Sequence, residues 1–374
     1  MSITMNAAVF RSKGADGAME SVTIDEPGPG EVIVEVRASG VCHTDAITRD
    51  GHMPFPLPGV LGHEGAGVVT KLGEGVTSLA IGDHVIMGWP YCGTCDACLK
   101  GEHRYCDLQG PGIVGGVRIV GPKAGECGYH AADGSALSGH FFGQSSFAQY
   151  ALAQASALVK IDKDVPFEIA GPLACGFTTG AGAIFHTAQP KPGDTVAIFG
   201  AGAVGLAAVM AAVNSPMTTI ICVDLNPERL ELARSLGATH VINAREEDPV
   251  ARIKEICGRT VTFAIDCTGV ISVIEQAIDS IGKLGTAILI GGAPAGATFS
   301  VDHFGALHGK RIVGTLGGSG RSDVLMPTLI ELWRQGRFPI DRLIKTFPFE
   351  QFNEAMHAGS AGEVVKPVLL MEGK

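Results

Sequence analysis

The sequence has 374 residues, of which 28 are Lys or Arg and 38 are Asp or Glu, so its formal charge is −10. This length favours two domains over one. Charged residues make up 18% and hydrophobic residues 46% of the chain, which excludes a disordered polymer. The acidic balance, without a cluster of basic residues, argues against nucleic acid as a partner.

The ten cysteines are few for this length, and the opening MSITMNAAVF lacks the basic and apolar regions of a signal peptide. We therefore expect reduced cysteines and a cytoplasmic protein. Residues 195–223 carry no charge and are long enough to cross a membrane. Three glycines and the run Asn214-Ser215-Pro216 interrupt them, so they predict a buried strand, helix and second strand instead of a span.

Short β-branched segments bounded by glycine predict a mostly β domain in the first part of the chain. The predicted strands are residues 31–40, 65–76, 82–88, 147–153 and 157–161.

From residue 194 the predicted strands alternate with helices, which indicates a parallel doubly wound sheet. The strands are residues 195–200, 218–224, 240–243, 261–266 and 287–292, and the helices are residues 203–213, 226–237, 249–257 and one segment before the last strand. A helix at 322–336 and a terminal strand in KPVLLM follow. This tail is too short for a domain, so we expect it to rejoin the first one.

A glycine-rich segment, Gly200-Ala201-Gly202-Ala203-Val204-Gly205, follows a predicted strand and opens a helix, and Asp224 ends the next strand. In dinucleotide-binding proteins the first glycine permits the turn, the second lets the backbone approach a pyrophosphate, and the third allows close helix packing. Asp224 can bind both ribose hydroxyls and would repel a 2′-phosphate, which favours NAD over NADP. The alternative is a glycine-rich packing turn.

Four cysteines, Cys92, Cys95, Cys98 and Cys106, have the spacing Cys-X2-Cys-X2-Cys-X7-Cys in a loop-like segment. Four thiolates can surround one tetrahedral ion and leave no position for a substrate, so they predict a structural zinc. Iron–sulfur binding and coincidental core cysteines are the alternatives.

Three further candidate ligands are dispersed: Cys42 in GVCHTD, His63 in GHEG and Cys175 in PLACGFTTG. Taken singly, a buried cysteine or a hydrogen-bonded core histidine is the commoner case for each. The residues alone leave a second metal site open.

Together these motifs resemble the zinc-dependent medium-chain alcohol dehydrogenases over nearly the whole chain. The matching segments are GVCHTD, GHEGAG, GDHVI, the four-cysteine loop, CGFTTG, GAGAVG with Asp224, and KPVLL. The resemblance implies a GroES-like, mostly β catalytic domain in residues 1–176 and 316–374, and a Rossmann domain with a doubly wound parallel sheet in residues 177–315 that binds NAD.

The resemblance also implies two zinc ions per chain, one structural and one catalytic. Cys42, His63 and Cys175 would bind the catalytic zinc and leave its fourth position to the alcohol oxygen, which agrees with the general pattern of catalytic zinc. Asp45 would orient His63, Glu64 would lie near the metal and assist ligand exchange, and Thr44 would accept the alcohol proton. The alternative reading of the two carboxylates is a solvated loop.

Four residues match family positions that contact the cofactor. By resemblance His43 and Lys366 face its phosphates, Arg229 contacts the adenosine ribose, and Thr179 lies in the CGFTTG segment. The alternative for Lys366 is an exposed lysine near the chain end.

The chain departs from many relatives at Ile47, five residues after the cysteine ligand, where they carry a histidine that passes the proton to solvent. His52 lies nearby, and we expect it to be an exposed loop residue. Proton release is then expected to go through water.

The segment Gly139–Ala148, with Ile47 and GRFPIDRLI, is similar to the aryl-alcohol (benzyl-alcohol) dehydrogenase branch. Trp89, Phe141 and Phe142 match pocket-wall positions, and aromatic walls suit a flat apolar substrate. The alternative is that these rings are ordinary strand core.

We therefore expect an NAD-dependent zinc alcohol dehydrogenase that oxidises primary aromatic or allylic alcohols, of the benzyl alcohol type, reversibly to aldehydes. By resemblance it is a homo-oligomer, dimer or tetramer, with no membrane attachment. The alternatives are a glutathione-dependent formaldehyde dehydrogenase, for which residues 108–116 offer no basic residue, a general aliphatic alcohol dehydrogenase, a zinc-free quinone reductase, and a non-enzymatic zinc-finger-like module.

Overall fold

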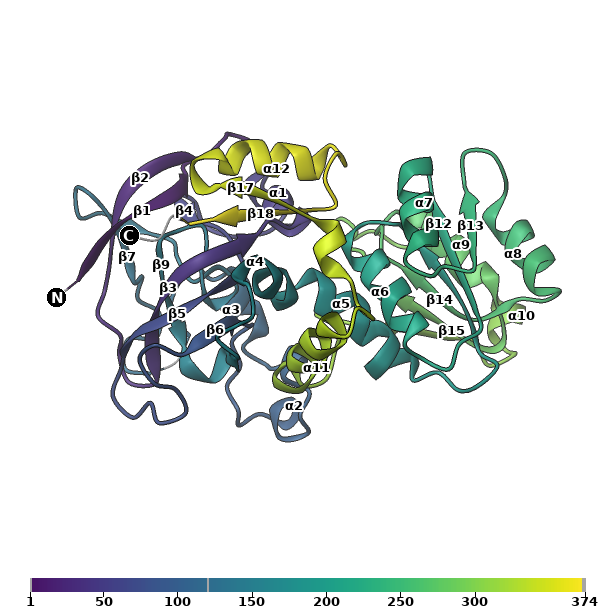
Figure 1. Cartoon of the computed structure of the whole chain (residues 1–374), viewed down its shortest axis with the longest axis horizontal. Coiled ribbons are helices and arrows are strands. Elements are labelled where there is room, and N and C mark those ends of the chain that lie inside the picture. Colours follow the sequence, from purple (N-terminus) through teal and green to yellow (C-terminus); the bar gives the residue numbers. More distant parts are fainter. Residues whose placement is uncertain (1, 120, 372–374) are drawn as a thin grey trace. The chain divides into compact units, whose positions relative to one another are not determined.

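The computed structural model describes residues 2–119 and 121–371, and the chain divides into two compact units (Figure 1). Unit 1 comprises the residues up to Cys175, Arg321–Glu331 and the residues from Ile340 onward. Unit 2 comprises Gly176–Gly320 and Leu332–Pro339.

Unit 1 is built on two mainly antiparallel sheets. The first has the order β4 (Gly59–Val60), β1 (Ile3–Phe10), β2 (Ala18–Ile24), β7 (Tyr129–Ala131) and β8 (Ala136–Leu137). The second has the order β10 (Leu158–Ile161), β6 (His84–Met87), β5 (Glu64–Leu72), β3 (Glu31–Gly40), β18 (Lys366–Leu370) and β17 (Ile344–Pro348), and β9 (Tyr150–Gln154) also pairs with β3. The last two strands of this order run parallel to each other.

Strand β3 is central because it pairs with β5, β9 and β18. Val32, Ile33, Val34 and Val36 are at most 1% exposed, and β-branched residues pack well on a pleated surface. The helices of unit 1 are α1 (His43–Arg49), α2 (Asp96–Leu99), α3 (Gln109–Val114), α4 (Phe167–Ala170), α12 (Phe352–Ser360) and α11 (Ser322–Arg334) as far as residue 331. The tail thus contributes β17, β18 and α12 to this unit.

Unit 2 is a six-stranded parallel sheet with helices beside it (Figure 1). Its order is β13 (His240–Asn243), β12 (Thr219–Asp224), β11 (Thr195–Phe199), β14 (Val261–Asp266), β15 (Ile281–Leu289) and β16 (Arg311–Gly314). The helices are α5 (Gly176–Gly182), α6 (Ala203–Val213), α7 (Pro227–Ser235), α8 (Pro249–Cys257), α9 (Ile271–Ser280) and α10 (His303–Ala306). The chain order reverses between β11 and β14, where doubly wound sheets bind ligands.

The charge-free run 195–223 forms β11, α6 and β12, as its glycines predicted. In the described part of the chain, no helix has the length and apolar character that crossing a bilayer requires. Several features differ from the sequence expectation, among them strands β4, β7, β8, β16 and β17, which were not predicted. Strands β1 and β2 were not predicted, and β15 begins at Ile281 instead of residue 287 because it continues through an irregular register, in which Leu284 has φ 59°.

Candidate functional site

The three dispersed ligands come together in unit 1, with Glu64 as a fourth member. One potential ligand atom from each of Cys42, His63, Glu64 and Cys175 lies within 4.8 Å of the others. Cys42 caps the N-terminus of α1, His63 directly precedes β5, and Glu64 is the first residue of that strand. Cys175 follows a 3-10 turn at Gly171–Ala174.

The hydrogen bonding of His63 shows that the cluster is suited to bind a metal ion. Nδ1 of His63 lies 3.0 Å from Oδ1 of Asp45, while Nε2 is buried and has no hydrogen-bond partner. The carboxylate also accepts hydrogen bonds from the backbone N–H groups of Cys42 at 2.9 Å and Gly62 at 3.1 Å. Asp45 thus holds the ring so that the Nε2 lone pair is free for a ligand bond, the arrangement typical of metal-bound histidines.

The two thiols of this cluster are strongly coupled. A hydrogen bond from Cys175 stabilises the thiolate of Cys42 and lowers the pKa of Cys42 well below its usual range, against the opposing effect of burial. The same interaction and burial raise the pKa of Cys175. A thiolate is the form of cysteine that binds metal, so the direction of this pKa shift favours metal binding by Cys42.

Lys366 lies behind the cluster and is buried. Its Nζ atom is 2.8 Å and 2.7 Å from the two carboxylate oxygens of Glu64, and it lies 3.4 Å from the carbonyl oxygen of Val41. The exposed position considered for Lys366 is therefore wrong. Burial is the main cause that raises the pKa of Glu64, and Lys366 opposes it.

The other residues expected near the metal lie on or after α1. Thr44 Oγ1 is 3.6 Å from the Cys42 sulfur. His43 is exposed and Ile47 half-buried. His52 is exposed in the loop that follows α1, as expected.

Aromatic rings cover the imidazole of His63. Phe142 stacks on it at a centroid distance of 4.5 Å, and Phe141 meets it edge-on at 5.5 Å. Trp89 packs edge-on against Phe142 at 4.8 Å. The two phenylalanines lie in a short 3-10 turn, Phe141–Gly143, in which Phe142 has φ 51°. The alternative of ordinary strand core therefore does not hold for them.

Gln144 is a residue of this site that the sequence analysis missed. Its Nε2 donates to the carbonyl oxygens of His63 at 3.0 Å and Met87 at 2.8 Å, and its Oε1 accepts from the N–H of Gly65 at 3.0 Å. The side chain is fully buried. Gln144 therefore fixes the backbone on both sides of His63 and Glu64. The one local signal was a polar run, Gln-Ser-Ser, between apolar residues.

The four-cysteine loop forms a second cluster in unit 1, in which the sulfur atoms of Cys92, Cys95, Cys98 and Cys106 lie within 4.8 Å of one another. The sulfur of Cys92 accepts from the backbone N–H groups of Thr94 at 3.4 Å and Cys95 at 3.3 Å. These contacts lower the pKa of Cys92 to about 6, with the Thr94 backbone as the largest cause. N–H donors aimed at sulfur fit a thiolate site for a tetrahedral ion.

The dinucleotide motif of unit 2 has the expected geometry. Gly200 has φ 99° at the turn after β11. A Cβ on Gly205 would meet the carbonyl oxygen of Gly200 at 1.8 Å, whereas a Cβ on Gly202 would meet nothing within 4 Å. Asp224 ends β12, and its carboxylate accepts from the N–H groups of Ala201 at 2.6 Å and Asn226 at 2.8 Å. The open space at Gly202 leaves room for a ligand close to the backbone.

The two remaining cofactor candidates of unit 2 are Thr179 and Arg229. Thr179 is buried in α5. Arg229 lies in the first turn of α7, and burial is the main cause that lowers its pKa.

Comparisons with known proteins identify the family. Residues 28–163 match the alcohol dehydrogenase GroES-like domain, and residues 203–333 match the zinc-binding dehydrogenase family. The chain is 39% identical to a geraniol dehydrogenase of Castellaniella defragrans, with 98% of each chain covered. It is 34% identical to an S-(hydroxymethyl)glutathione dehydrogenase of Paracoccus denitrificans, with 97% of this chain and 99% of the relative covered.

Solved structures of related proteins support the same family assignment. A benzyl alcohol dehydrogenase from Acinetobacter calcoaceticus is similar with a TM-score of 0.92 and 41% identity over 99% of this chain and 100% of the other. An alcohol dehydrogenase zinc-binding domain protein from Burkholderia ambifaria has a TM-score of 0.96 and 44% identity over 100% of both chains.

These findings confirm the expected fold class, a GroES-like domain with a nearly closed antiparallel barrel and a Rossmann-type parallel sheet. The expected metals are also confirmed, with a catalytic zinc site at Cys42, His63, Glu64 and Cys175 and a structural site at the four-cysteine loop. NAD is the typical cofactor of such proteins. The chain belongs to the zinc-binding medium-chain alcohol dehydrogenases.

Proposed function

We propose that this enzyme is an NAD-dependent dehydrogenase of primary aromatic or allylic alcohols, which it oxidises reversibly to aldehydes. The observation that carries the proposal is the aromatic wall at the metal cluster, where Phe142 stacks on His63 and Trp89 packs against Phe142. Flat unsaturated substrates gain binding free energy from stacking on aromatic rings as well as from the burial of apolar surface. In this proposal residues 1–176 and 316–374 form the catalytic domain and residues 177–315 the NAD-binding domain.

Zinc supplies a Lewis acid that lowers the pKa of an alcohol, and NAD supplies the hydride acceptor. Asp45 keeps His63 in the tautomer whose Nε2 faces the metal cluster. Thr44, beside Cys42, accepts the proton of the alcohol. The proton then leaves through water, because Ile47 has no group that can carry it.

Lys366 determines where the carboxylate of Glu64 lies. Because both oxygens of Glu64 accept hydrogen bonds from the Lys366 ammonium, the carboxylate is held by a cation and is available for ligand exchange only when that pair opens. With the pair closed, Cys42, His63 and Cys175 would hold the zinc, and Lys366 would keep the Glu64 carboxylate away from it.

In unit 2 we assign the NAD contacts to Gly200, Gly202, Gly205 and Asp224, with Thr179 and Arg229 as further contacts. His43 of unit 1 remains a candidate contact, whereas the ammonium of Lys366 is held by Glu64 and Val41. The carboxylate of Asp224 is fixed against the glycine-rich turn by the N–H of Ala201. A fixed carboxylate at the end of β12 favours ribose hydroxyls and disfavours a 2′-phosphate.

A second candidate function is the oxidation of S-(hydroxymethyl)glutathione, which the 34% identical relative from Paracoccus denitrificans carries in its name. The segment from Leu108 to Gly116 contains no basic residue for its carboxylates. The geraniol and benzyl alcohol dehydrogenases have higher identities, 39% and 41%. The names of these two relatives therefore support unsaturated alcohols as the substrates in our proposal.

The test compares kcat/KM for benzyl alcohol, geraniol, ethanol and S-(hydroxymethyl)glutathione with NAD. An aromatic ring in an apolar pocket should gain several kcal/mol, from ~0.8 kcal/mol per buried CH2, so benzyl alcohol should exceed ethanol by at least roughly a hundredfold. Trp89→Ala should reduce that ratio, whereas Phe304→Ala, at a 69% exposed aromatic residue, should leave it unchanged. A preference for ethanol or for the glutathione adduct would overturn the assignment.

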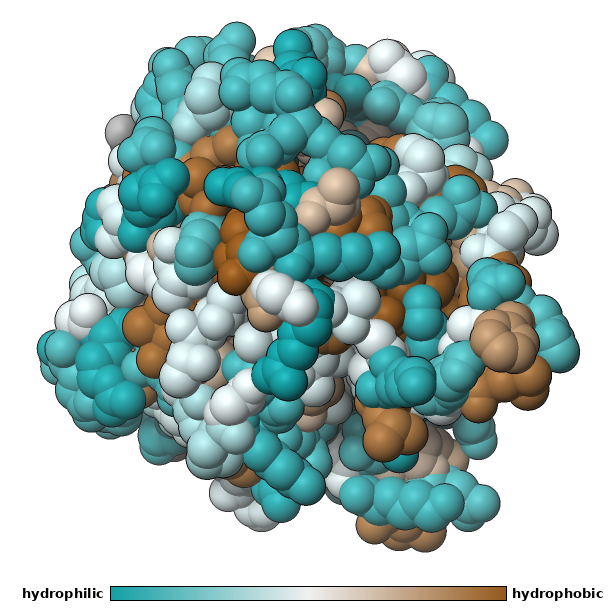
Figure 2. Space-filling view, turned by 90° about the vertical axis from the view of Figure 1, so that its right-hand side faces the viewer, coloured by the Kyte–Doolittle hydropathy of each residue, from teal (hydrophilic) through white to brown (hydrophobic). Residues whose placement is uncertain are grey.

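We also propose that the chain forms a homo-oligomer. Strand β16 is the last strand of the unit 2 sheet. Three apolar residues that precede β16 in the chain are exposed: Leu284 by 76%, Phe304 by 69% and Leu307 by 68%. Figure 2 faces this end of unit 2 and shows apolar side chains among polar ones. An open edge with an apolar patch is typical of an association surface, and light scattering of the purified enzyme tests it.

A cytoplasmic location belongs to the same proposal. None of the ten cysteines forms a disulfide, and unbridged cysteines persist in reducing compartments. Fractionation of cells that express the protein with its own N-terminus tests the location.

A further inference from the structure

A buried cation of unit 1 lacks a carboxylate partner among the described residues, although the charge of the Cys175 thiolate acts on it. Arg104 lies in the 3-10 turn His103–Tyr105, between the third and fourth cysteines of the structural loop, and is 2% exposed. Its Nε and Nη2 atoms are buried and donate no hydrogen bond. Burial lowers the pKa of Arg104 to about 10. A buried charge without a partner is costly, so such groups are normally paired.

The other buried arginine of this unit shows the usual solution. Arg118 is 3% exposed, and its guanidinium lies 3.2 Å from Asp25 and 3.2 Å from Glu31. Among the residues that the structure describes, no carboxylate comes within ion-pair distance of Arg104. Arg118, like Arg104, has buried guanidinium nitrogens that donate no hydrogen bond, so the two side chains differ in the carboxylates that lie beside Arg118.

One face of the Arg104 guanidinium is covered by an aromatic ring, and one buried edge of it has no hydrogen-bond partner. Its central carbon lies 4.4 Å from the centroid of the Trp89 ring, a cation–π contact. The unpartnered Nε and Nη2 belong to one edge of the planar group. This edge is one that a carboxylate can bind with two parallel hydrogen bonds. Nε1 of Trp89 is a third buried donor without a partner.

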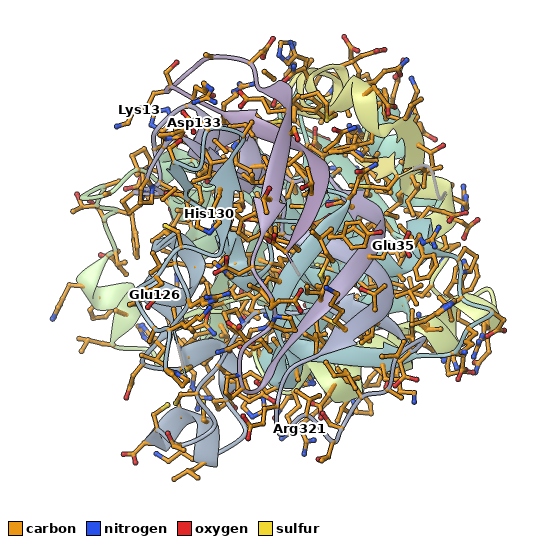
Figure 3. The ribbon with its side chains drawn as sticks, turned by 90° about the vertical axis from the view of Figure 1, so that its left-hand side faces the viewer. Lys13, Glu35, Glu126, His130, Asp133 and Arg321 are labelled. Carbon is orange, nitrogen blue, oxygen red and sulfur yellow. The ribbon has the colours of Figure 1, made fainter. Side chains whose placement is uncertain are left out.

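Trp89 and Arg104 line a hollow of unit 1, and their unpartnered donor atoms are buried in its wall. Residues of three chain segments form its wall: Gly88, Trp89, Tyr91, His103 and Arg104, then residues 156–159, and residues 322–323. The carboxylate in this wall, Asp323, is already paired with Arg321, which Figure 3 labels on the surface of unit 1. The unsatisfied groups of the hollow are thus donors, and they match an acceptor.

We propose that Arg104 and Trp89 form a binding site for a carboxylate. The carboxylate accepts two hydrogen bonds from the free edge of the guanidinium and a third from the indole N–H, and it supplies the charge that Arg104 lacks. Chloride lacks the two oxygens that make parallel hydrogen bonds with that edge, and a neutral amide lacks the charge.

The position of the site suggests two sources for the carboxylate. Trp89 packs on Phe142, and Phe142 packs on His63, so the site is two rings away from a metal ligand. The carboxylate is then either the remote end of an alcohol substrate or a separate small acid. The proposal for the site does not depend on the choice of alcohol, because binding can be measured without turnover.

The binding experiment uses the zinc-loaded enzyme and benzoate, with benzamide and chloride at equal concentration as comparisons. The chain has two tryptophans, so a Trp333→Phe background leaves Trp89 as the fluorescent reporter. We expect benzoate to change this fluorescence and to raise the melting temperature more than benzamide or chloride does. Arg104→Met should weaken benzoate binding by tenfold or more, and Arg104→Lys should weaken it less, because an ammonium keeps the charge and lacks the fork.

Arg11→Met is the matched control, because it removes an arginine of unit 1 whose side chain is 55% exposed and does not line the hollow, so it should leave benzoate binding unchanged. Zinc content and the melting temperature without ligand show whether each variant is folded. If Arg104→Met does not fold, the comparison of Arg104→Lys with the unmodified enzyme decides. Equal binding of benzoate and benzamide by the unmodified enzyme, or benzoate binding that no Arg104 variant alters, would overturn the site.

A second arm separates the two sources. It compares kcat/KM for 4-(hydroxymethyl)benzoate and 4-methylbenzyl alcohol, which differ in the remote charge. A loss of tenfold or more on the first and less than threefold on the second in Arg104→Met assigns the carboxylate to the substrate. An unchanged ratio with lost benzoate binding assigns it to a separate acid. Failure of both alcohols as substrates would refute the proposed function and leave the binding result standing.

Discussion

The ammonium of Lys366 donates to both carboxylate oxygens of Glu64, at 2.8 Å and 2.7 Å, although the two residues are 302 positions apart. Both side chains are buried. The last strand of unit 1 therefore supplies the charge that balances the first residue of β5, next to His63. The metal cluster thus depends on a residue at the far end of the chain.

Lys366→Met should lower the free energy of unfolding by about 3–5 kcal/mol, because it leaves a buried carboxylate without its cation. The double variant Glu64→Gln with Lys366→Met should be more stable than the single one, since no charge then remains unpaired. Urea unfolding of the zinc-loaded proteins measures both. Additive losses in the double variant would show that the pair does not couple.

The two cysteine sites should separate on mutation. Cys92→Ser should reduce the zinc content from two to one per chain and lower the melting temperature, because the structural loop loses a thiolate ligand. Cys42→Ser should abolish turnover and retain the structural zinc. Metal analysis and thermal melting measure these effects, and Cys257→Ser, outside both clusters, is the control. Iron in the fresh protein would contradict the zinc assignment of the loop.

Cofactor choice should depend on Asp224. We expect kcat/KM with NAD to exceed that with NADP by on the order of a hundredfold, about 3 kcal/mol, because the carboxylate fixed by Ala201 repels a 2′-phosphate. Asp224→Gly should erode the ratio mainly by lowering activity with NAD. Asp248→Gly, at the N-cap of α8, should leave the ratio unchanged. Equal use of both cofactors by the unmodified enzyme would show that another residue reads the ribose.

Stability should fall in acid partly through His140. Burial, helped by the charge of Arg118, lowers the pKa of His140 to about 3. The folded protein therefore keeps this ring neutral while the unfolded chain takes up a proton below its ordinary pKa of ~6.5. Stability is lost as the pH falls from 6.5 towards 3, by about 3 kcal/mol at pH 4.5.

His140→Asn should flatten this pH dependence, since asparagine tolerates the positive φ of 56° at this position. His52→Asn, at an exposed residue, should not change it. Urea unfolding between pH 7 and pH 4.5 gives the comparison. Parallel curves for the unmodified protein and His140→Asn would rule out this ring as a cause.

Proton release should respond to Ile47. A histidine placed there by Ile47→His adds a titrating group at α1, so the pH profile of alcohol oxidation should gain activity at lower pH. His52→Ala should have little effect. A large loss on His52→Ala would show that the proton route runs through that loop.

The elements with strong periodicity could be predicted from the sequence. The helix expected at residues 203–213 is α6, and the strand expected at 31–40 is β3. Strands β1 and β2 were missed because ITMNAAVF and AMESVTI lack a dense β-branched pattern and are held by pairing with each other. The early start of β15 was missed because Lys283, Leu284 and Gly285 read as a turn.

The metal ligands could be predicted because the motifs are local, whereas their supports are not. Gln144 contacts the backbone of His63 across 81 positions, and no periodicity connects them. The same holds for Arg104, whose isolation from carboxylates is a property of the packed unit. Contacts between residues so far apart in the sequence arise from the chain topology. Local propensities and motif spacing do not predict that topology.

The discontinuity of unit 1 bears on the order of events during synthesis. When residue 175 has left the ribosome, all the catalytic ligands have been made, yet Lys366 has not. Since chains fold from the N-terminus as they are made, Glu64 in the nascent chain has no ammonium beside it while residues 176–320 of unit 2 are added. A polypeptide that stops before β18 contains every zinc-binding side chain but lacks the cation that restrains Glu64, so the catalytic centre is complete only after β18 has been translated.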